Sequence, residues 1–259
     1  MAHPTALLIP DIHKDHGFLE RVLAREPIEQ HQSIILMGDY FDGRDIDTRG
    51  PAAARKTARI ICALEAEIGD RLILLWGNHD LPYYVHQRMH QLAHPKTAEI
   101  HSWRSILGVA PESQASAQAV SEEWSLKFWQ KLRPFAYVHG HLVCHAGLHR
   151  SFYPKSRQPV APALKRLTMR WAQSVRILTD EKVANGILSA GEARGGEPGT
   201  VGGLAWLDWE REFADDLPFP QIVAHSSGAV RRQRGRSHCI DYAQSAYGIL
   251  GEELSIRPI

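Results

Sequence analysis

The sequence contains few cysteines and no long apolar runs. Its three cysteines, Cys62, Cys144 and Cys239, are widely and irregularly spaced, so they indicate neither a zinc ribbon nor a disulfide framework. No stretch approaches the roughly 20 apolar residues that a membrane helix requires. The apolar run 6–9 is also too short for a signal peptide. These absences predict a soluble, cytoplasmic protein without a membrane partner.

A strong net charge is absent as well. The 30 Lys and Arg residues nearly balance the 29 Asp and Glu residues, which leaves a formal charge of +1. Bulk charge therefore argues neither for nor against nucleic acid, and no stable nucleic-acid partner is implied. Fifteen histidines make metal or acid/base chemistry worth seeking. The length suits one large domain, and without repeats or a clear linker we predict a single domain over residues 1–259.

Short apolar runs alternate with helical patterns in the first third of the chain. Continuous apolar residues at 6–9, 33–37 and 72–76 predict strands that are covered on both faces. Helical spacing at 17–25 and 52–68 separates them. This order predicts right-handed crossovers and a parallel sheet, so all three strands should end at the same sheet edge.

The remaining segments are less regular. Residues 82–134 are predicted to be mostly helical, and 160–178 is predicted to be one further helix. We expect a hairpin of strands 135–138 and 142–145, a mobile Gly-rich loop at 185–203, a buried strand at 220–224, and closing antiparallel strands at 239–243 and 247–250.

Side chains that can bind metals follow five of the predicted strands, where ligands bind in α/β sheets. Small residues such as glycine accompany most of them and would let the backbone come close. Asp11 and His13 are two residues apart, so in an extended segment their side chains would point to the same side. The residues are Asp11 and His13, Asp39 and Asp42, Asn78 and His79, His145, and His225.

These motifs, in this order, resemble the calcineurin-like metallophosphoesterase superfamily. Its pattern of DxH, GDxxD, GNHD, a lone His before glycine and a late His matches residues 11–13, 38–42, 77–80, 145–147 and 224–226. The segments GDYFD and FWQKLRPFAYVHGHLVCHAGL resemble the phosphoprotein phosphatase branch, and CID near the end resembles bacterial diadenosine tetraphosphatases and phage protein phosphatases. Ser227 stands where many phosphodiesterases of the superfamily have a second metal-binding histidine, which favours the phosphatase branch.

The resemblance implies a four-layer α/β/β/α sandwich with a dinuclear metal site at the carboxyl ends of the strands. Two divalent or trivalent ions are implied, with Mn expected and Fe or Zn as alternatives, because mixed nitrogen and oxygen ligands suit these metals. Asp39 would bridge both ions. The implied ligands are Asp11, His13 and Asp39 for one ion, and Asp39, Asn78, His145 and His225 for the other.

The resemblance also implies catalytic roles. A metal-bridging hydroxide would attack the phosphate, and His79 would protonate the leaving oxygen as general acid. Asp42 would pair with His79, whereas Asp80 either holds the same ring or is structural. The related phosphatases have arginine directly after the residue corresponding to Asp42, but here Gly43 takes that place. Arg44 would then bind the phosphate through a shifted loop, with Arg49 as the alternative.

The leading hypothesis is a phosphomonoesterase of protein-phosphatase type that acts on a phosphoprotein or small phosphate ester. A dinucleoside polyphosphate or other nucleotide hydrolase is the second hypothesis, and it would differ only in cap segments at about 81–133 and 150–203. A deep, aromatic-lined pocket there would favour nucleotides. The third is a non-catalytic scaffold, but such proteins usually lose a metal ligand or the catalytic histidine, and here all of those positions are intact.

Overall fold

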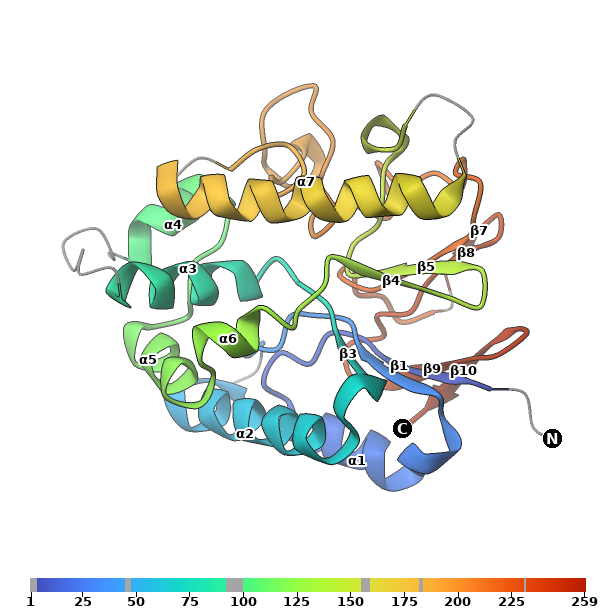
Figure 1. Ribbon diagram of the computed structural model, residues 1–259, viewed down its shortest axis with the longest axis horizontal. Coiled ribbons are helices and arrows are strands. Elements are labelled where there is room, and N and C mark those ends of the chain that lie inside the picture. Colours follow the sequence, from blue (N-terminus) through green and yellow to red (C-terminus); the bar gives the residue numbers. More distant parts are fainter. Residues whose placement is uncertain (1–3, 45–47, 92–99, 155–158, 182–183, 231) are drawn as a thin grey trace.

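Two five-stranded sheets face each other, and helices cover their outer faces, in the α/β/β/α arrangement of a metallophosphoesterase sandwich (Figure 1). The computed structural model describes residues 4–44, 48–91, 100–154, 159–181, 184–230 and 232–259. The first sheet has the order β10 (Leu254–Pro258), β9 (Ala246–Leu250), β1 (Ala6–Ile9), β2 (Ser33–Leu36) and β3 (Leu72–Leu74). The second has the order β4 (Phe135–Val138), β5 (His141–Cys144), β6 (Gln221–Val223), β8 (Ser237–Cys239) and β7 (Arg232–Arg234).

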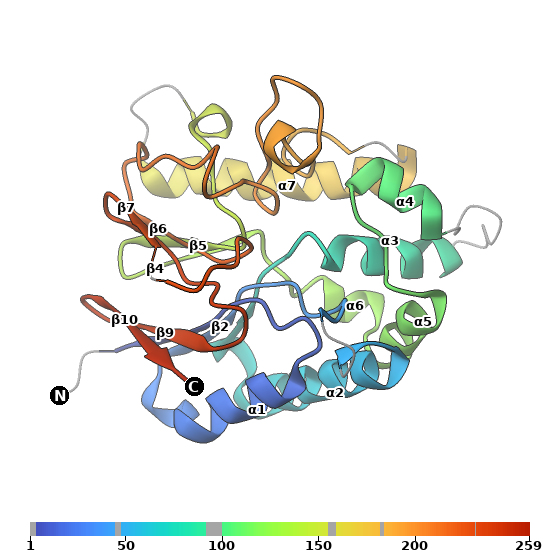
Figure 2. The same ribbon diagram turned by 180° about the vertical axis from the view of Figure 1, so that it is seen from behind.

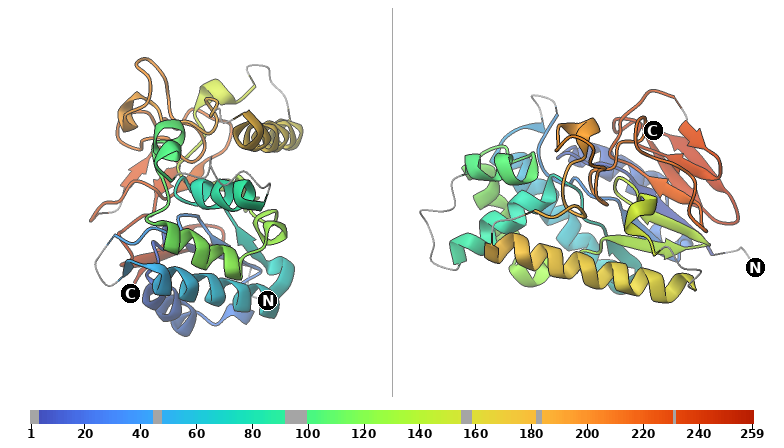
Figure 3. Two further views of the ribbon diagram at one scale, coloured as in Figure 1. Left: turned by 90° about the vertical axis from the view of Figure 1, so that its left-hand side faces the viewer. Right: turned by 90° about the horizontal axis from the view of Figure 1, so that it is seen from above.

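The helices lie in three groups. Helices α1 (His16–Arg25) and α2 (Pro51–Ile68) cover the first sheet, and α7 (Val160–Glu181) covers the second (Figures 1 and 2). The third group lies at one end of the sandwich, as the two views of Figure 3 also show, and consists of α3 (Asp80–Gln91), α4 (Ile100–Leu107), α5 (Gln114–Glu123) and α6 (Leu126–Trp129). Within the described residues, no helix is long and apolar enough to cross a membrane.

The three N-terminal strands are parallel, as predicted. Strand β1 pairs with β2 and β2 pairs with β3, both in parallel. Pro51 begins α2, and Gly69, in the left-handed region at a φ of 54°, ends it. The carboxyl ends of the three strands therefore lie at one edge of the sheet, where the predicted ligands follow them.

Alternation along β1 shows how the sandwich is filled. Leu7 and Ile9 pack into the large core beneath the helices, whereas Ala6 and Leu8 belong to a separate apolar cluster that also contains Val143 and Ile222 from the second sheet. Side chains of a strand alternate between its faces, so each inner strand contributes to both cores. Burial on both faces explains the continuous apolar runs in the sequence.

Aromatic side chains from the end of α5 to α6 form part of the core. Trp124 and Trp129 are fully buried, and the Trp129 ring stacks on Trp76 at 5.5 Å between centroids. Together they fix the helical end of the sandwich against the loop that follows β3.

The closing strands differ from the prediction. Strand β8 ends at Cys239, so the predicted strand 239–243 is wrong: Ala243 and Gln244 adopt left-handed φ values of 51° and 58°, which break an extended run. Strands β7 and β10 were not predicted: β7 is a three-residue polar strand, and no residue of β10 is fully buried. Residues 184–203 form a loop that contains only a short 3₁₀ helix, Glu192–Arg194.

Candidate metal centre

The loops that follow β1, β2 and β3 are in direct contact. The backbone N–H of His13 donates to the carbonyl of Asp39 at 2.7 Å, and that of Lys14 donates to Tyr40 at 2.9 Å. A Cβ atom on Gly38 would lie 2.5 Å from the nitrogen of Gly77, so glycine is required for the second and third loops to approach. The three loops thereby present their polar side chains to one point.

Two groups of side chains at this point could each hold a metal ion. The first is Asp11, His13 and Asp39, and the second is Asp39, His145 and His225. Within each group the candidate ligand atoms lie within 4.8 Å of one another, and every member is buried. Asp39 belongs to both groups, so its carboxylate lies between two candidate cation positions.

The donor atoms around His145 fit a cation better than a proton. Its Nδ1 donates to the carbonyl of Met37 at 2.9 Å, so Nε2 is the free lone pair. Around Nε2 lie Asn78 Oδ1 at 3.0 Å, His225 Nδ1 at 3.2 Å and Asp39 Oδ2 at 3.4 Å. A single proton could be shared with only one of these lone pairs, whereas a cation would be bound by all of them.

His13 shows the same arrangement. Its Nδ1 lies 2.9 Å from the carbonyl of Asp42. Its Nε2 lies 3.3 Å from Asp11 and 3.6 Å from Asp39, yet it is buried and without a hydrogen bond in the described residues. Such an orphaned buried nitrogen fits a metal ligand. Combined nitrogen and oxygen donors suit a transition metal better than calcium or magnesium.

The charges at the centre are strongly coupled. Burial raises the pKa of Asp11, but the nearby His145 and His13 outweigh burial and lower this pKa to about 2. The pKa of Asp39 is likewise well below its usual value, because the nearby imidazoles outweigh burial. Burial lowers the pKa of His145, but Asp39 and Asp11 raise it to about 9. The carboxylates are thus anionic and attract positive charge, which bound cations would supply in place of protons on the imidazoles.

His79 and Asp42 form a hydrogen-bonded pair beside the two groups. His79 Nδ1 lies 2.8 Å from Asp42 Oδ2, and 29% of the His79 side chain is exposed. The other oxygen of Asp42 accepts from the hydroxyl of Tyr83 and, at 2.9 Å, from the backbone N–H of Glu112. Burial lowers the pKa of His79, but Asp39 and Asp42 raise it to about 9. The ring is therefore held by one edge while its other nitrogen faces outward.

Comparison with known proteins identifies the family. The model of the calcineurin-like phosphoesterases matches residues 4–158, more than half of the chain. The chain belongs to this family. It is thus a metal-dependent phosphoesterase, and the family implies a centre of two divalent metals, for which the Asp and His groups above provide ligands.

Solved structures show the same fold as this phosphoesterase. A cold-active protein-tyrosine phosphatase of a psychrophilic Shewanella species is 12% identical, with a TM-score of 0.61, covering 99% of this chain and 78% of that chain. Another structure of a cold-active protein tyrosine phosphatase is 13% identical, with a TM-score of 0.59, covering 98% and 79% respectively. No curated protein matches the chain in sequence.

Asp80 has a structural role in the phosphoesterase and does not hold His79. Its carboxylate accepts from the backbone N–H groups of Asp39 at 2.8 Å, Tyr40 at 2.9 Å and Gly77 at 2.9 Å. It is fully buried, and burial together with Asp39 raises its pKa to about 7. Asp80 thus fixes the second and third loops together from beneath the metal groups.

Arg44 lies against the first metal group. Its Nη2 is 3.1 Å from Asp11 Oδ2 and 3.7 Å from Asp241 Oδ2, and its Nη1 donates to Ser227. Asp241 is fully buried and also accepts from the Ser227 hydroxyl. The sequence analysis did not identify Asp241 as a site residue, although it lies in the CID segment that carried part of the resemblance.

A second arginine, Arg194, lies on the side of His225. It donates to the hydroxyl of Ser226 at 2.7 Å and pairs with Asp208 at 2.8 Å. Sequence reasoning missed Arg194, since it belongs to a Gly-rich loop far from every motif. The consecutive residues Ser226 and Ser227 therefore each hold one arginine beside the metal groups.

Four of the predicted site residues have left-handed backbones. His13, Asp39, Asp42 and His225 have φ values of 48°, 52°, 71° and 62°. This region costs a residue with a side chain about 1–2 kcal/mol. Such strain concentrates at functional sites, where the surrounding contacts hold it in place.

Proposed function

We propose that the protein hydrolyses phosphate monoesters at a centre of two divalent cations, with Mn as the expected metal and Fe or Zn as alternatives. The proposed ligands are those of the sequence analysis, namely Asp11, His13, Asp39, Asn78, His145 and His225. When bound, two such cations would lower the pKa of a water molecule and stabilise charge on the phosphoryl oxygens. The shared position of Asp39 and the orphaned nitrogen of His13 support this ligand set.

The pairing of His79 with Asp42, next to these groups, is the observation on which the catalytic proposal depends. Asp42 accepts from Nδ1, so the proton on the outward-facing Nε2 can be donated to the leaving oxygen. Asp42 orients the ring and favours its protonated form. A scaffold that only bound metals would have no need for this pair.

Arg44 is the proposed phosphate contact. It is about one-third exposed beside Asp11, and guanidinium groups bind phosphate oxygens in pairs. We propose a protein-phosphatase-like substrate, because Ser227 replaces a histidine that would suit a phosphodiesterase and instead contacts Arg44.

Hydrolysis of p-nitrophenyl phosphate with added Mn²⁺ tests the proposal. We expect activity in the wild type and a loss of at least about 100-fold in Asp39→Asn. His79→Asn should lose at least about 100-fold on phenyl phosphate, whose leaving group needs an acid, because a general acid is worth about 10²–10⁴ in rate. His141→Asn, at the first residue of β5, is the matched control and should keep full activity. Undiminished hydrolysis in both site variants would reject the assigned site.

A further inference from the structure

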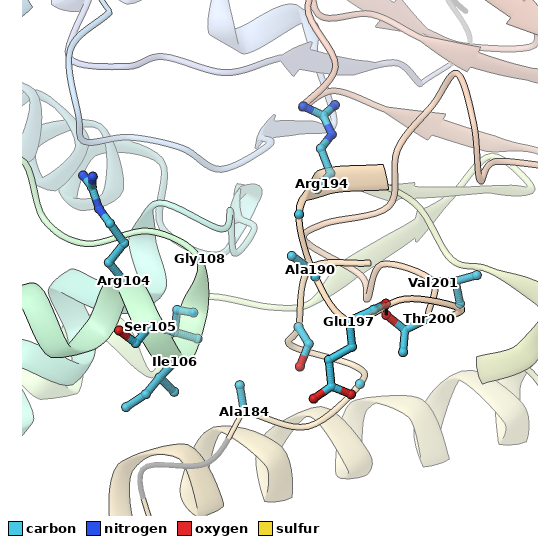
Figure 4. A pocket seen from close by; sticks show the side chains of 15 residues that line it. Arg104, Ser105, Ile106, Gly108, Ala184, Ala190, Arg194, Glu197, Thr200 and Val201 are labelled. Atoms are coloured by element: carbon cyan, nitrogen blue, oxygen red, sulfur yellow. Dashed lines mark hydrogen bonds between the residues drawn. The ribbon is translucent and has the colours of Figure 1, made fainter. Parts of the chain in front are cut away.

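A cavity of about 570 Å³ lies between the C-terminal end of α4 and the loop 184–203, and we call it the cap cavity (Figure 4). Its wall includes Arg104, Gly108, Arg194, Glu197 and Thr200. This volume is in the range of small-molecule sites. Its walls belong to the two predicted cap segments, at about 81–133 and 150–203.

Two residues of the cavity wall, Arg194 and Gly108, are linked to the proposed metal ligand His225 by a short chain of contacts. Arg194, on its wall, donates to Ser226, the residue after His225. On the other wall, a Cβ atom on Gly108 would lie 3.3 Å from Trp206, whose ring in turn packs edge-on against His225 at 5.9 Å between centroids. Each wall of the cavity therefore reaches His225 through one intervening residue, Ser226 on one side and Trp206 on the other.

The positive and negative side chains of the cavity wall lie at different ends of the cavity. Figure 4 shows Arg104 and Arg194 on opposite walls with both guanidinium groups on the same side of the cavity, whereas Glu197 lies toward α7. Arg104 is exposed, and its guanidinium makes no hydrogen bond or ion pair with the described residues. Arg194 uses Nε and Nη2 for Asp208 and Ser226, and its Nη1 makes no such bond within the described chain. Both arginines thus have free donors for an anion.

The wall is also without aromatic side chains among the described residues, so no stacking platform for a nucleobase is present. Close backbone packing shapes it instead: a Cβ atom on Gly196 would lie 2.1 Å from the carbonyl oxygen of Ala190. The loop is consequently folded tightly onto itself and forms a defined wall.

Resting on the proposed function, we propose that the cap cavity receives the part of the substrate beyond the scissile phosphate, and that Arg104 and Arg194 select phosphomonoesters carrying a second negative group. That group is a carboxylate or another phosphate, since either is bound by guanidinium. Glu197 lies at the end of the cavity near α7, where it would repel a further negative group on the substrate.

Matched substrate pairs test this inference in the Mn²⁺-loaded protein. The first pair is a phosphoserine peptide with flanking aspartates and the same peptide with asparagines. The second is a sugar bisphosphate and the corresponding sugar monophosphate. We expect the wild type to prefer the charged member of at least one pair by about tenfold in kcat/KM, the size of one charge-assisted hydrogen bond. The pair that shows the preference identifies the source of the second charge.

Variants of Arg104 assign the preference to the cavity. Arg104→Gln should abolish it and Arg104→Glu should reverse it, while p-nitrophenyl phosphate, which has no second charge, is hydrolysed at the wild-type rate. Arg257→Gln, an exposed change on β10, is the control and should retain the preference. Equal rates within both pairs, or a preference that survives in Arg104→Gln, would overturn the inference. Failure of the wild type to hydrolyse p-nitrophenyl phosphate would instead reject the proposed function.

Discussion

Removing the hydroxyl of Tyr83 should weaken the proposed acid catalysis without touching a proposed metal ligand. Tyr83 is 1% exposed, and its hydroxyl donates to Asp42 Oδ1, the oxygen opposite the one that binds His79. In Tyr83→Phe this oxygen keeps only the N–H of Glu112 at 2.9 Å. The carboxylate then has one donor fewer to fix its plane, and the ring it holds becomes less well oriented.

The size of the effect follows from this contact. A hydrogen bond to a charged acceptor contributes about 1.5–3 kcal/mol, and the remaining donor preserves part of the orientation. We therefore expect about 1 kcal/mol to be lost from the transition state, which corresponds to about a fivefold lower kcat. Asp42→Asn removes the charge itself and should cost at least about 100-fold.

The assay compares two leaving groups. Phenyl phosphate releases a phenol with a pKa near that of tyrosine, about 10, so it needs the acid, whereas p-nitrophenyl phosphate releases a much better leaving group. The fivefold loss should appear with phenyl phosphate and largely disappear with p-nitrophenyl phosphate. Tyr84→Phe is the matched control, since its hydroxyl makes no hydrogen bond within the described residues. Equal losses on both substrates would refute the role of Tyr83 in orienting the acid.

Three further outcomes are expected. Asp80→Asn places an amide against three backbone N–H groups, so urea unfolding should show a loss of about 2–4 kcal/mol. Burial, assisted by His90, lowers the pKa of His86 to about 4. The unfolded chain therefore takes up that proton first, and stability should fall as pH falls from about 6.5 toward 4, less steeply in His86→Gln, as followed by thermal melts. Mn²⁺ at about 100 times its Kd should stabilise the protein by about 2.7 kcal/mol, and a calorimetric shift of the same size in Asp39→Ala would contradict the ligand assignment.

The sequence predicted the parallel strands and the helices between them well, because apolar runs and 3.6-residue spacing report burial directly. It also placed the candidate ligands that follow the first three strands at one sheet edge, since parallel strands end together. Contacts between residues far apart in the chain were harder to predict. The contacts of Tyr83 and Glu112 with Asp42 join positions with no shared motif, and nothing local marks them.

Only the three-dimensional structure distinguishes the two roles left open for Asp80. A carboxylate next to His79 in sequence can point toward the ring or back toward the loops, and the backbone N–H groups of Asp39 and Gly77 decide this. Arg194 was missed for a different reason. It lies in a glycine-rich segment, whose sequence has no periodicity from which its position in the fold could be predicted. The edge strand β7 was missed because a short polar strand resembles a loop in sequence, and β10 because it lacks a continuous buried run.

The left-handed backbones at His13, Asp39, Asp42 and His225 have a consequence for directed evolution. Glycine would adopt each of these torsions without steric penalty. A library screened only for heat tolerance should therefore accumulate glycine at the codons of His13 and His225 and lose turnover as it does so, whereas glycine at Asp39 or Asp42 would also remove acceptors for His79 and Tyr83. The chemistry of the site thus requires side chains at torsions that glycine would adopt more readily.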